Sequence, residues 1–173
     1  MTGDFTVREA RAEDAGAIAD VHVQGWQWGY RELLPAEALA RIDRAQRVAM
    51  WTSVLDGSFD GALVWVAERD GAVIGFAADG PSRDAGAPED EGELYALYLR
   101  EDAAAQGVGR ALLEAAVNDL RERGAEIAVL WVLGSNARAL TFYAKAGWTP
   151  DGATRSEPWE GVTLEEVRLR VKW

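Results

Sequence analysis

The sequence predicts a single α/β domain in which helices flank a mixed, mostly antiparallel sheet with one central parallel pair of strands. The 173 residues are 49% hydrophobic and 27% charged, the composition of an ordinary globular protein with one core. The Asp70–Gly71 pair lies between two strand-like runs and predicts an antiparallel hairpin. A strand at 93–99, a helix and a strand at 127–133 predict a βαβ unit with parallel strands and a right-handed crossover. We therefore treat residues 1–173 as one domain.

Hydrophobic periodicity predicts the elements before the parallel pair. They are a strand at 5–8, a helix within 12–30, a second helical stretch from Pro35 to about Leu55, and strands at 63–68 and 72–79. Pro35 is expected to open its helix because proline is preorganised for the first helical position.

The elements around and after the parallel pair follow in the same way. They are a loop at 81–92, a strand at 93–99, a helix that ends near Gly124, a strand at 127–133, a helix at 137–145 and a final strand at 162–173. The first of these helices has an apolar face of Leu112, Leu113, Ala116, Val117 and Leu120. The segment 149–163 is interpreted as a loop between the last strands.

Charge and composition exclude several classes of function. A formal net charge of -11 argues against a broad basic face for nucleic acid or anionic lipid and favours a cationic small substrate. The absence of cysteine excludes disulfides, thiolate metal sites and a cysteine nucleophile. The N-terminal residues lack the regions of a signal peptide, and the longest apolar run, at 62–67, is too short to span a membrane. We expect a cytoplasmic protein that binds no metal, nucleic acid or membrane.

Two glycines, Gly107 and Gly109, mark the turn from the strand at 93–99 into the following helix. A helix N-terminus has unpaired N–H groups and a partial positive charge, so it attracts phosphate, and Arg110 adds a cation. The alternative is that the glycines only form a tight turn. A dinucleotide fingerprint is disfavoured because Leu112 occupies the third glycine position, and no P-loop lysine follows.

The stretches LYALYLREDAAAQGVGRALLEAAV and LWVLGSNARALTFYAKAGW resemble the signature region of the GNAT-type N-acetyltransferases. The resemblance is most specific from Glu93 to Trp148. The family pattern Gln/Arg-x-x-Gly-x-Gly/Ala falls on residues 104–109, with Ala104 in place of the usual first residue. The resemblance implies a GNAT-like fold whose parallel strands splay apart, and acetyl-CoA as the cosubstrate.

The same resemblance implies how acetyl-CoA binds. The backbone of the strand before the glycine turn would pair with the pantetheine arm, and the turn would hold the pyrophosphate. The implied cofactor-binding residues are Leu97, Tyr98, Leu99, Ala105, Gln106, Gly107, Val108, Gly109, Arg110, Ala111 and Asn136. The N–H of Leu99, or one beside it, would polarise the thioester carbonyl.

Acetyl transfer to an amine needs a base for the ammonium proton and an acid for the departing thiolate. By the resemblance, Tyr143 is the acid; the alternative is that it only packs on an amphipathic helix. Glu93 matches a general-base glutamate of some family members, or merely ends an acidic loop. Alternation predicts that Tyr95, Leu97 and Leu99 lie on the same strand face as this glutamate.

Four aromatic residues are candidates for binding the acceptor. Trp26 and Tyr30 lie four residues apart on one face of the expected helix, and with Trp28 they could contact an apolar or aromatic part of an amine. Core packing is the alternative. Trp159, on the expected loop at 149–163, either recognises the acceptor or packs inward.

We therefore predict an acetyl-CoA-dependent N-acetyltransferase that acetylates a primary amine by direct attack, with Glu93 as base and Tyr143 as acid. The acceptor is a small-molecule amine or a peptide amine. A non-catalytic acyl-CoA-binding sensor and a nucleotide-binding protein are alternatives from other classes. A homodimer stays open, because Trp51, Trp65 and Trp173 could pack at a dimer face or within the monomer.

Overall fold

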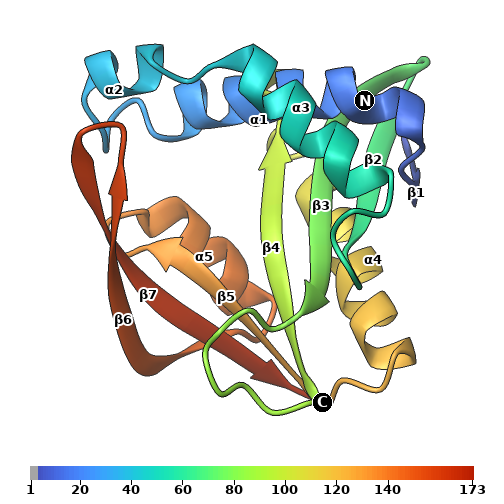
Figure 1. Ribbon diagram of the computed structural model, residues 1–173, viewed down its shortest axis with the longest axis vertical. Coiled ribbons are helices and arrows are strands. Elements are labelled where there is room, and N and C mark those ends of the chain that lie inside the picture. Colours follow the sequence, from blue (N-terminus) through green and yellow to red (C-terminus); the bar gives the residue numbers. More distant parts are fainter. Residues whose placement is uncertain (1–3) are drawn as a thin grey trace.

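The computed structural model describes residues 4–173 (Figure 1). Its elements are β1 (Thr6–Glu9), η1 (Ala12–Asp14), α1 (Ala15–Gly29), α2 (Ala36–Ala40), α3 (Arg44–Leu55), β2 (Leu63–Arg69), β3 (Ala72–Pro81), β4 (Glu91–Leu99), η2 (Glu101–Ala103), α4 (Val108–Glu122), β5 (Ile127–Leu133), α5 (Ala137–Lys145), β6 (Thr149–Trp159) and β7 (Val162–Lys172). Most of them agree with the predicted positions, and β5 and α5 agree at both ends.

The strands form one seven-stranded sheet in the order β1-β2-β3-β4-β5-β7-β6. β4 and β5 are parallel, and the other neighbouring strands are antiparallel. The predicted mixed sheet with a central parallel pair and flanking helices is therefore confirmed. The predicted hairpin is also present, since Asp70 and Gly71 join β2 to β3 with positive φ angles of 51° and 77°, as a type I′ turn requires.

The parallel pair is joined over a short length only. β4 and β5 pair from Glu91 to Glu93, and beyond that point the strands diverge toward α1 (Figure 1). A diverging strand leaves backbone N–H and C=O groups without partners. The divergence therefore creates a place where an extended ligand can pair with the sheet.

Helices cover both faces of the sheet. α1 and α3 pack on one face, around a core that includes Ile18 and Phe76. α4 and α5 pack on the other face, around a core that includes Leu112 and Trp148. Within residues 4–173, no helix is both long enough and apolar enough to cross a membrane.

The helical stretch expected from Pro35 to Leu55 is two helices rather than one. α2 ends at Ala40, and α3 begins directly after Asp43. The Asp43 carboxylate accepts hydrogen bonds from the amides of Ala45 and Gln46, at 2.8 and 3.2 Å. This N-cap starts a new helix at a position where hydrophobic periodicity gives no sign of a break.

The interpretation of 149–163 as a loop is wrong. β6 occupies most of this segment and forms a long hairpin with β7. Pro150, Gly152 and Pro158 hid the strand, since proline and glycine normally disfavour one. β6 is an edge strand, where a missing N–H is tolerated, and a register shift after Pro150 absorbs the glycine. Trp159 is therefore the last residue of an edge strand.

A bulge at Tyr95 makes the predicted common face of β4 wrong. The register between β3 and β4 shifts there, so that Tyr95 has no partner on β3. The extra residue reverses the alternation of side chains. Tyr95 packs with the core beneath α1, whereas Leu97 and Leu99 pack with the core beneath α4. Glu93 shares a face with Tyr95 but not with these two leucines.

His22 is buried on α1, as a helix-face residue. Its Nδ1 accepts a hydrogen bond from Trp51 Nε1 at 3.1 Å, and its ring stacks on Tyr98 with a centroid separation of 5.1 Å. Burial, with a smaller effect of the Arg47 charge, lowers the pKa of His22 to about 3. The side chain is therefore neutral in the folded protein.

Replacing His22 with glutamine should make stability less sensitive to acid. A histidine in the unfolded chain titrates at about 6.5, so between pH 7.5 and 5 the unfolded state gains a proton that folded His22 does not. Stability is lost as pH falls, by about 2 kcal/mol through this residue. Urea denaturation of both proteins at the two pH values measures the difference. Asp79, whose pKa is raised by burial, is present in both proteins, so its contribution to the pH dependence of stability cancels in the comparison. Equal losses would contradict the prediction.

Candidate active site

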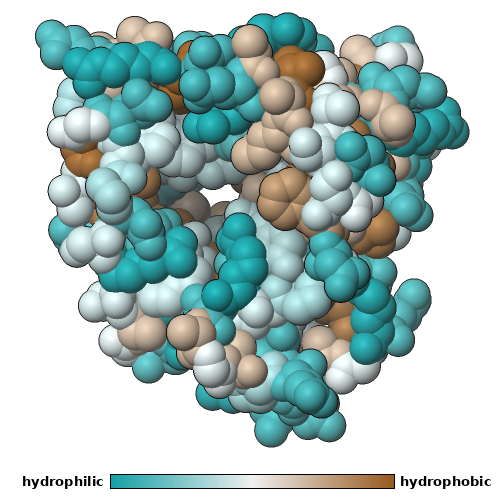
Figure 2. All heavy atoms as spheres, viewed as in Figure 1, coloured by the Kyte–Doolittle hydropathy of each residue, from teal (hydrophilic) through white to brown (hydrophobic). Residues whose placement is uncertain are grey.

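A cleft of about 1560 Å³ opens where β4 and β5 diverge. Figure 2 shows that the surface is hollowed below α1, between β4 and the β6–β7 hairpin. The predicted site residues that line the cleft are Trp26, Trp28, Tyr30, Glu93, Leu97, Tyr98, Leu99, Ala105, Gly107, Gly109, Arg110, Asn136, Tyr143 and Trp159. The structure thus brings both predicted catalytic residues to one cleft. Gln106, Val108 and Ala111 are not part of its lining.

The free edge of β4 offers backbone groups to the cleft. The N–H of Arg100 donates to Ile74 O at 2.9 Å, so the N–H and C=O of the preceding residue, Leu99, point away from β3. Alternation gives Leu97 the same orientation. The indole Nε1 of Trp28 donates to Leu99 O at 2.8 Å. The other outward groups of this edge can pair with an extended amide chain as a neighbouring strand would.

The N-terminus of α4 faces the same cleft. The helix begins at Val108, after Gly107 as N-cap. The first intrahelical bond runs from the N–H of Ala111 to Gly107 O at 3.0 Å, so the amides of Val108, Gly109 and Arg110 have no helical partner. These N–H groups and the helix dipole attract an anion.

Gln106 and Val108 stabilise this turn without lining the cleft. Gln106 Oε1 accepts a hydrogen bond from Arg69 Nη2 at 2.8 Å, and its Nε2 donates to Asp102 O at 2.7 Å. Val108 is fully buried in the core. Ala104, which replaces the usual cationic or amide side chain, lines the cleft with a methyl group only. The groups of this turn that could bind an anion are therefore mainly backbone amides.

The two glycines of the turn serve different purposes. Gly107 has a left-handed φ of 84°, which strains any other residue. Gly109 is helical, and a Cβ there would lie 3.5 Å from Leu99 Cδ1 and 3.5 Å from the Phe142 ring, an ordinary contact. Gly107 therefore shapes the turn, while Gly109 sits where α4 meets β4 and α5.

Tyr143 lies on the buried face of α5 and is 8% exposed. Burial, and then the neighbouring Tyr30, raises the pKa of Tyr143, so its phenol is protonated at neutral pH. Asn136 caps the same helix, since its Oδ1 accepts a hydrogen bond from Ala139 N–H at 3.1 Å. Tyr30, at the end of α1, lies beside Tyr98 and Asn136 in the same cleft. A protonated phenol in this cleft can act as a general acid.

Glu93 lies where the strands part and is 1% exposed. Its Oε2 accepts hydrogen bonds from Arg83 N and Nε, at 2.8 and 3.3 Å, and its Oε1 accepts one from Arg83 Nη2 at 2.7 Å. The guanidinium group also lies over the Tyr95 ring, 4.2 Å from its centroid. A carboxylate has about four lone-pair sites, so these three bonds leave one for a ligand or water.

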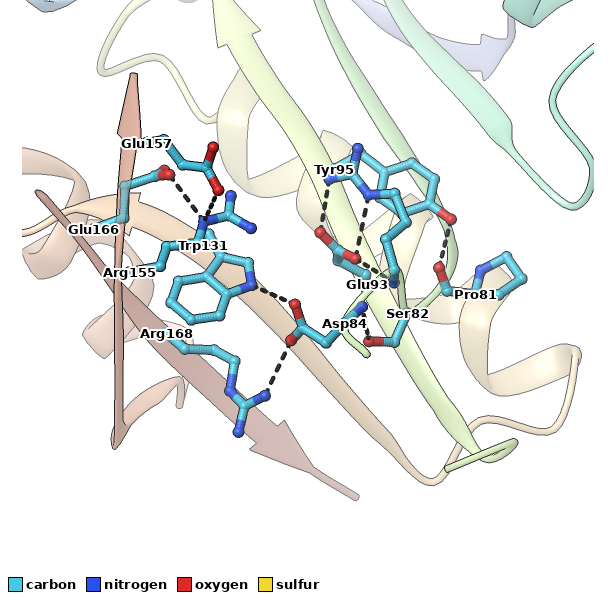
Figure 3. A network of polar contacts seen from close by, with 11 residues as sticks. Pro81, Ser82, Asp84, Glu93, Tyr95, Trp131, Arg155, Glu157, Glu166 and Arg168 are labelled. Carbon is cyan, nitrogen blue, oxygen red and sulfur yellow. Dashed lines mark hydrogen bonds and ion pairs between the residues drawn. The ribbon is translucent and has the colours of Figure 1, made fainter. Parts of the chain in front are cut away.

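A chain of polar contacts ties the β3–β4 loop to the β6–β7 hairpin (Figure 3). Asp84 accepts hydrogen bonds from Trp131 Nε1 at 2.9 Å and from Arg168 Nη1 at 3.0 Å. Arg155 Nε donates to Glu166 at 3.0 Å, and its guanidinium lies 4.4 Å from the centroid of the Trp131 ring. These contacts hold loop and hairpin against β5.

The predicted acceptor residues have two different sets of neighbours in the cleft. Trp26 packs against Tyr30 and Trp159, with centroid separations of 4.6 Å to each ring. Trp28 instead lies at the edge of β4, and the guanidinium of Arg138 covers its ring at 4.3 Å. The spacing of these residues on α1 did not predict that Trp28 has different neighbours from Trp26.

Sequence reasoning missed Arg83, Trp131 and Arg155, all of which line the cleft. Trp131 was detectable, because it alternates with the buried Leu130 and Val132 along a predicted strand. No local sequence pattern around Arg83 or Arg155 indicates that their side chains line the cleft. Between residues 4 and 173, no group of three or more His, Cys, Asp or Glu side chains could hold a metal ion.

Sequence comparison identifies relatives over nearly the whole chain. The model of the acetyltransferase (GNAT) family matches residues 20–148. The chain is 36% identical over 165 residues to a Bacillus subtilis protein named uncharacterized N-acetyltransferase YuaI, an alignment that covers 95% of this chain and 91% of that protein.

Solved structures have the same fold. The PaiA N-acetyltransferase from Thermoplasma acidophilum, solved in complex with coenzyme A, superposes with a TM-score of 0.81 at 20% identity, covering 98% of this chain and 99% of that one. The yncA protein of Salmonella typhimurium, solved with its cofactor acetyl-CoA, gives 0.72 at 21% identity, covering 98% and 94%. At such identities the likeness concerns the fold alone.

Alanine substitutions at the two glycines should have opposite effects on stability. Gly107→Ala should lower the free energy of unfolding by about 1–2 kcal/mol, because alanine is strained at this φ. Gly109→Ala should be neutral or stabilising by up to about 1 kcal/mol, because the position is helical and the Cβ fits. Urea denaturation measures both changes, and a loss as large for Gly109→Ala as for Gly107→Ala would contradict this division of roles.

Proposed function

The chain belongs to the acetyltransferase (GNAT) family, and we propose that it transfers the acetyl group of acetyl-CoA to a primary amine by direct attack of the amine nitrogen. One observation carries the proposal: the free edge of β4, the N-terminus of α4 and the buried Tyr143 meet in one cleft. Acetyl-CoA supplies an acyl group that is already activated as a thioester.

The residues present suit acetyl-CoA. The free amides of Val108, Gly109 and Arg110 would bind its pyrophosphate, and the outward backbone groups of Leu97 and Leu99 would pair with its pantetheine amides. Ala104 removes one side-chain contact but none of these amides. The coenzyme A and acetyl-CoA complexes of the two structural relatives support this assignment.

Glu93 would take the proton of the acceptor ammonium. An alkylamine with a pKa of about 10.4 is almost entirely protonated at neutral pH and must lose a proton before it attacks. The lone-pair site that Arg83 leaves on this carboxylate would receive the proton directly or through a water. Because Glu93 shares the face of Tyr95, it is directed to the side of the sheet on which α1 lies.

Tyr143 would protonate the departing thiolate. Its buried phenol keeps the proton at neutral pH and would donate it in a hydrogen bond to the departing sulfur. Because burial raises the pKa of this phenol above the value of about 8.5 of a thiol, transfer to the thiolate would be completed as the phenolate regains a proton from the attacking nitrogen, which loses one when the amide forms. The outward N–H of Leu97 or Leu99 would stabilise negative charge on the carbonyl oxygen. Direct attack needs no enzyme nucleophile, which suits a chain without cysteine.

A thermal-shift titration combined with a thiol-release assay tests this function. At 100 times its Kd a ligand adds about 2.7 kcal/mol of stability. Stabilisation by acetyl-CoA and CoA but not by ATP, with thiol released only when an amine is present, supports the proposal. Stabilisation without thiol release for any amine would favour a non-catalytic acyl-CoA sensor. No stabilisation by either CoA species would contradict the cofactor site.

Tyr143→Phe should lower kcat by about 100-fold or more while the Kd for CoA stays near the wild-type value, because only the acidic proton is removed. Tyr95→Phe is the matched control for the loss of a hydroxyl from the cleft, since the Tyr95 hydroxyl is already bonded to Pro81 O. Thiol release measures kcat, and calorimetry measures Kd. Unchanged turnover in Tyr143→Phe would remove this tyrosine from the mechanism.

Glu93→Gln should lower kcat/KM most at neutral pH and progressively less as the pH approaches 10. Raising the pH deprotonates the amine in solution, so proton removal by Glu93 is no longer needed. The ratio of wild-type to variant kcat/KM between pH 7 and 10 measures this trend. A ratio that does not change with pH would mean that Glu93 acts only by pairing with Arg83.

A further inference from the structure

Aromatic rings from three elements meet at the end of the cleft that lies below α1. Trp26 contacts Tyr30 and Trp159 at 4.6 Å and Tyr98 at 6.2 Å between ring centroids. We call Trp26, Tyr30, Tyr98 and Trp159 the aromatic wall. All four line the cleft. The wall is a continuous surface contributed by the end of α1, by β4 and by the tip of the β6–β7 hairpin.

The carboxylates that the sheet contributes to this cleft already have partners. Glu93 is bound by Arg83, and Glu166 is bound by Arg155 at 3.0 Å. A second ammonium group on an acceptor would have to displace a guanidinium from one of them. Glu93 is 1% exposed, so displacing Arg83 would remove the partner of a nearly buried carboxylate. These two strand carboxylates thus disfavour a second positive charge against the sheet.

The same two guanidinium groups, those of Arg83 and Arg155, also lie over aromatic rings outside the wall. Arg83 lies over Tyr95 at 4.2 Å, and Arg155 lies over Trp131 at 4.4 Å. Figure 3 shows Arg155 stacked against Trp131 beside Glu157 and Glu166. The rings of Tyr95 and Trp131 are therefore engaged on one face. Among residues 4–173, no guanidinium lies over a ring of the aromatic wall.

The hairpin encloses this end of the cleft. Its tip reaches α2 (Figure 1), where Arg41 Nη1 donates to Glu160 O at 2.8 Å. Trp159, one residue earlier, stacks on Trp26 with an interplanar angle of 30°. The chain thus bridges the acceptor side from the sheet edge to the helices. An enclosed approach suits a small molecule better than an amine on the surface of a folded protein.

We propose that the acceptor is a small monoamine that carries an aromatic or bulky apolar group, which packs on the aromatic wall with its nitrogen directed along β4 toward Glu93. The proposal rests on the acetyltransferase function proposed above. Binding then depends mainly on the burial of apolar surface against rings, and a single ammonium group meets the single lone-pair site left on Glu93.

Three matched amines test the substrate class: phenethylamine, butylamine and putrescine. Butylamine lacks the ring, and putrescine adds a second ammonium group to butylamine. The expected order of kcat/KM in the thiol-release assay is phenethylamine, butylamine, putrescine, with at least about a tenfold difference between the first and the last. A kcat/KM for putrescine equal to or above that for phenethylamine would overturn the proposal.

Trp159→Leu tests the aromatic wall itself. Its KM for phenethylamine should rise about tenfold while its KM for acetyl-CoA is unchanged, and Trp159→Phe should recover part of the loss. Trp173→Leu is the matched control, because Trp173 packs beneath Arg121, bonds to Ala125 O and is not itself part of the cleft lining. Thermal melting verifies that each variant folds. An unchanged KM for phenethylamine in Trp159→Leu would overturn the proposal.

Calorimetric titration of the CoA-saturated protein with the same amines separates the two proposals. Tighter binding of phenethylamine than of putrescine, without thiol release from any amine, would leave the aromatic acceptor site standing and remove the acetyltransferase function. Thiol release with a higher kcat/KM for putrescine than for phenethylamine would leave the acetyltransferase function standing and remove the aromatic acceptor site.

Discussion

The divergence of β4 from β5 is the constraint on which the rest of the site depends. The strands share hydrogen bonds from Glu91 to Glu93 and then part, so a central strand has a free edge in the middle of a seven-stranded sheet. Such an edge is unfavourable unless another group satisfies it. One of these edge groups is satisfied within the protein, since Trp28 Nε1 donates a hydrogen bond to Leu99 O. The remaining edge groups, together with the free amides of α4, suit a ligand that is extended along the strand and anionic at the helix.

Burial of Glu93 at the point of divergence imposes a second requirement. A nearly buried carboxylate is unfavourable without a compensating charge. Arg83 supplies that charge from the β3–β4 loop, and the next residue, Asp84, is fixed by Trp131 and Arg168. The loop is therefore attached to β5 and β7 at the residue beside the one that neutralises the proposed base. The position of this base depends on the hairpin side of the sheet as well as on β4.

The sequence predicted the parts of the fold that depend on local periodicity and missed those that depend on distant partners. β5, α5 and the Asp70–Gly71 turn were predictable because apolar spacing and positive φ are local properties. β6 was hidden because Pro150 and Pro158 disfavour strands everywhere except at a sheet edge. The bulge at Tyr95 arises from the register with β3, which no stretch of β4 encodes alone. The site residues came from motif resemblance, and Arg83 and Arg155 were missed because ion pairing across the sheet leaves no spacing pattern.

The end of α1 links the two halves of the cleft. Trp26 and Tyr30 lie four residues apart and so share the helix face that turns to the hairpin, while Trp28, between them, turns to the edge of β4. Arg138 of α5 covers Trp28, so the same helix end also contacts the element that carries Tyr143. A ligand that pairs with the β4 edge near Leu99 would therefore lie beside Trp28, two residues along α1 from Trp26.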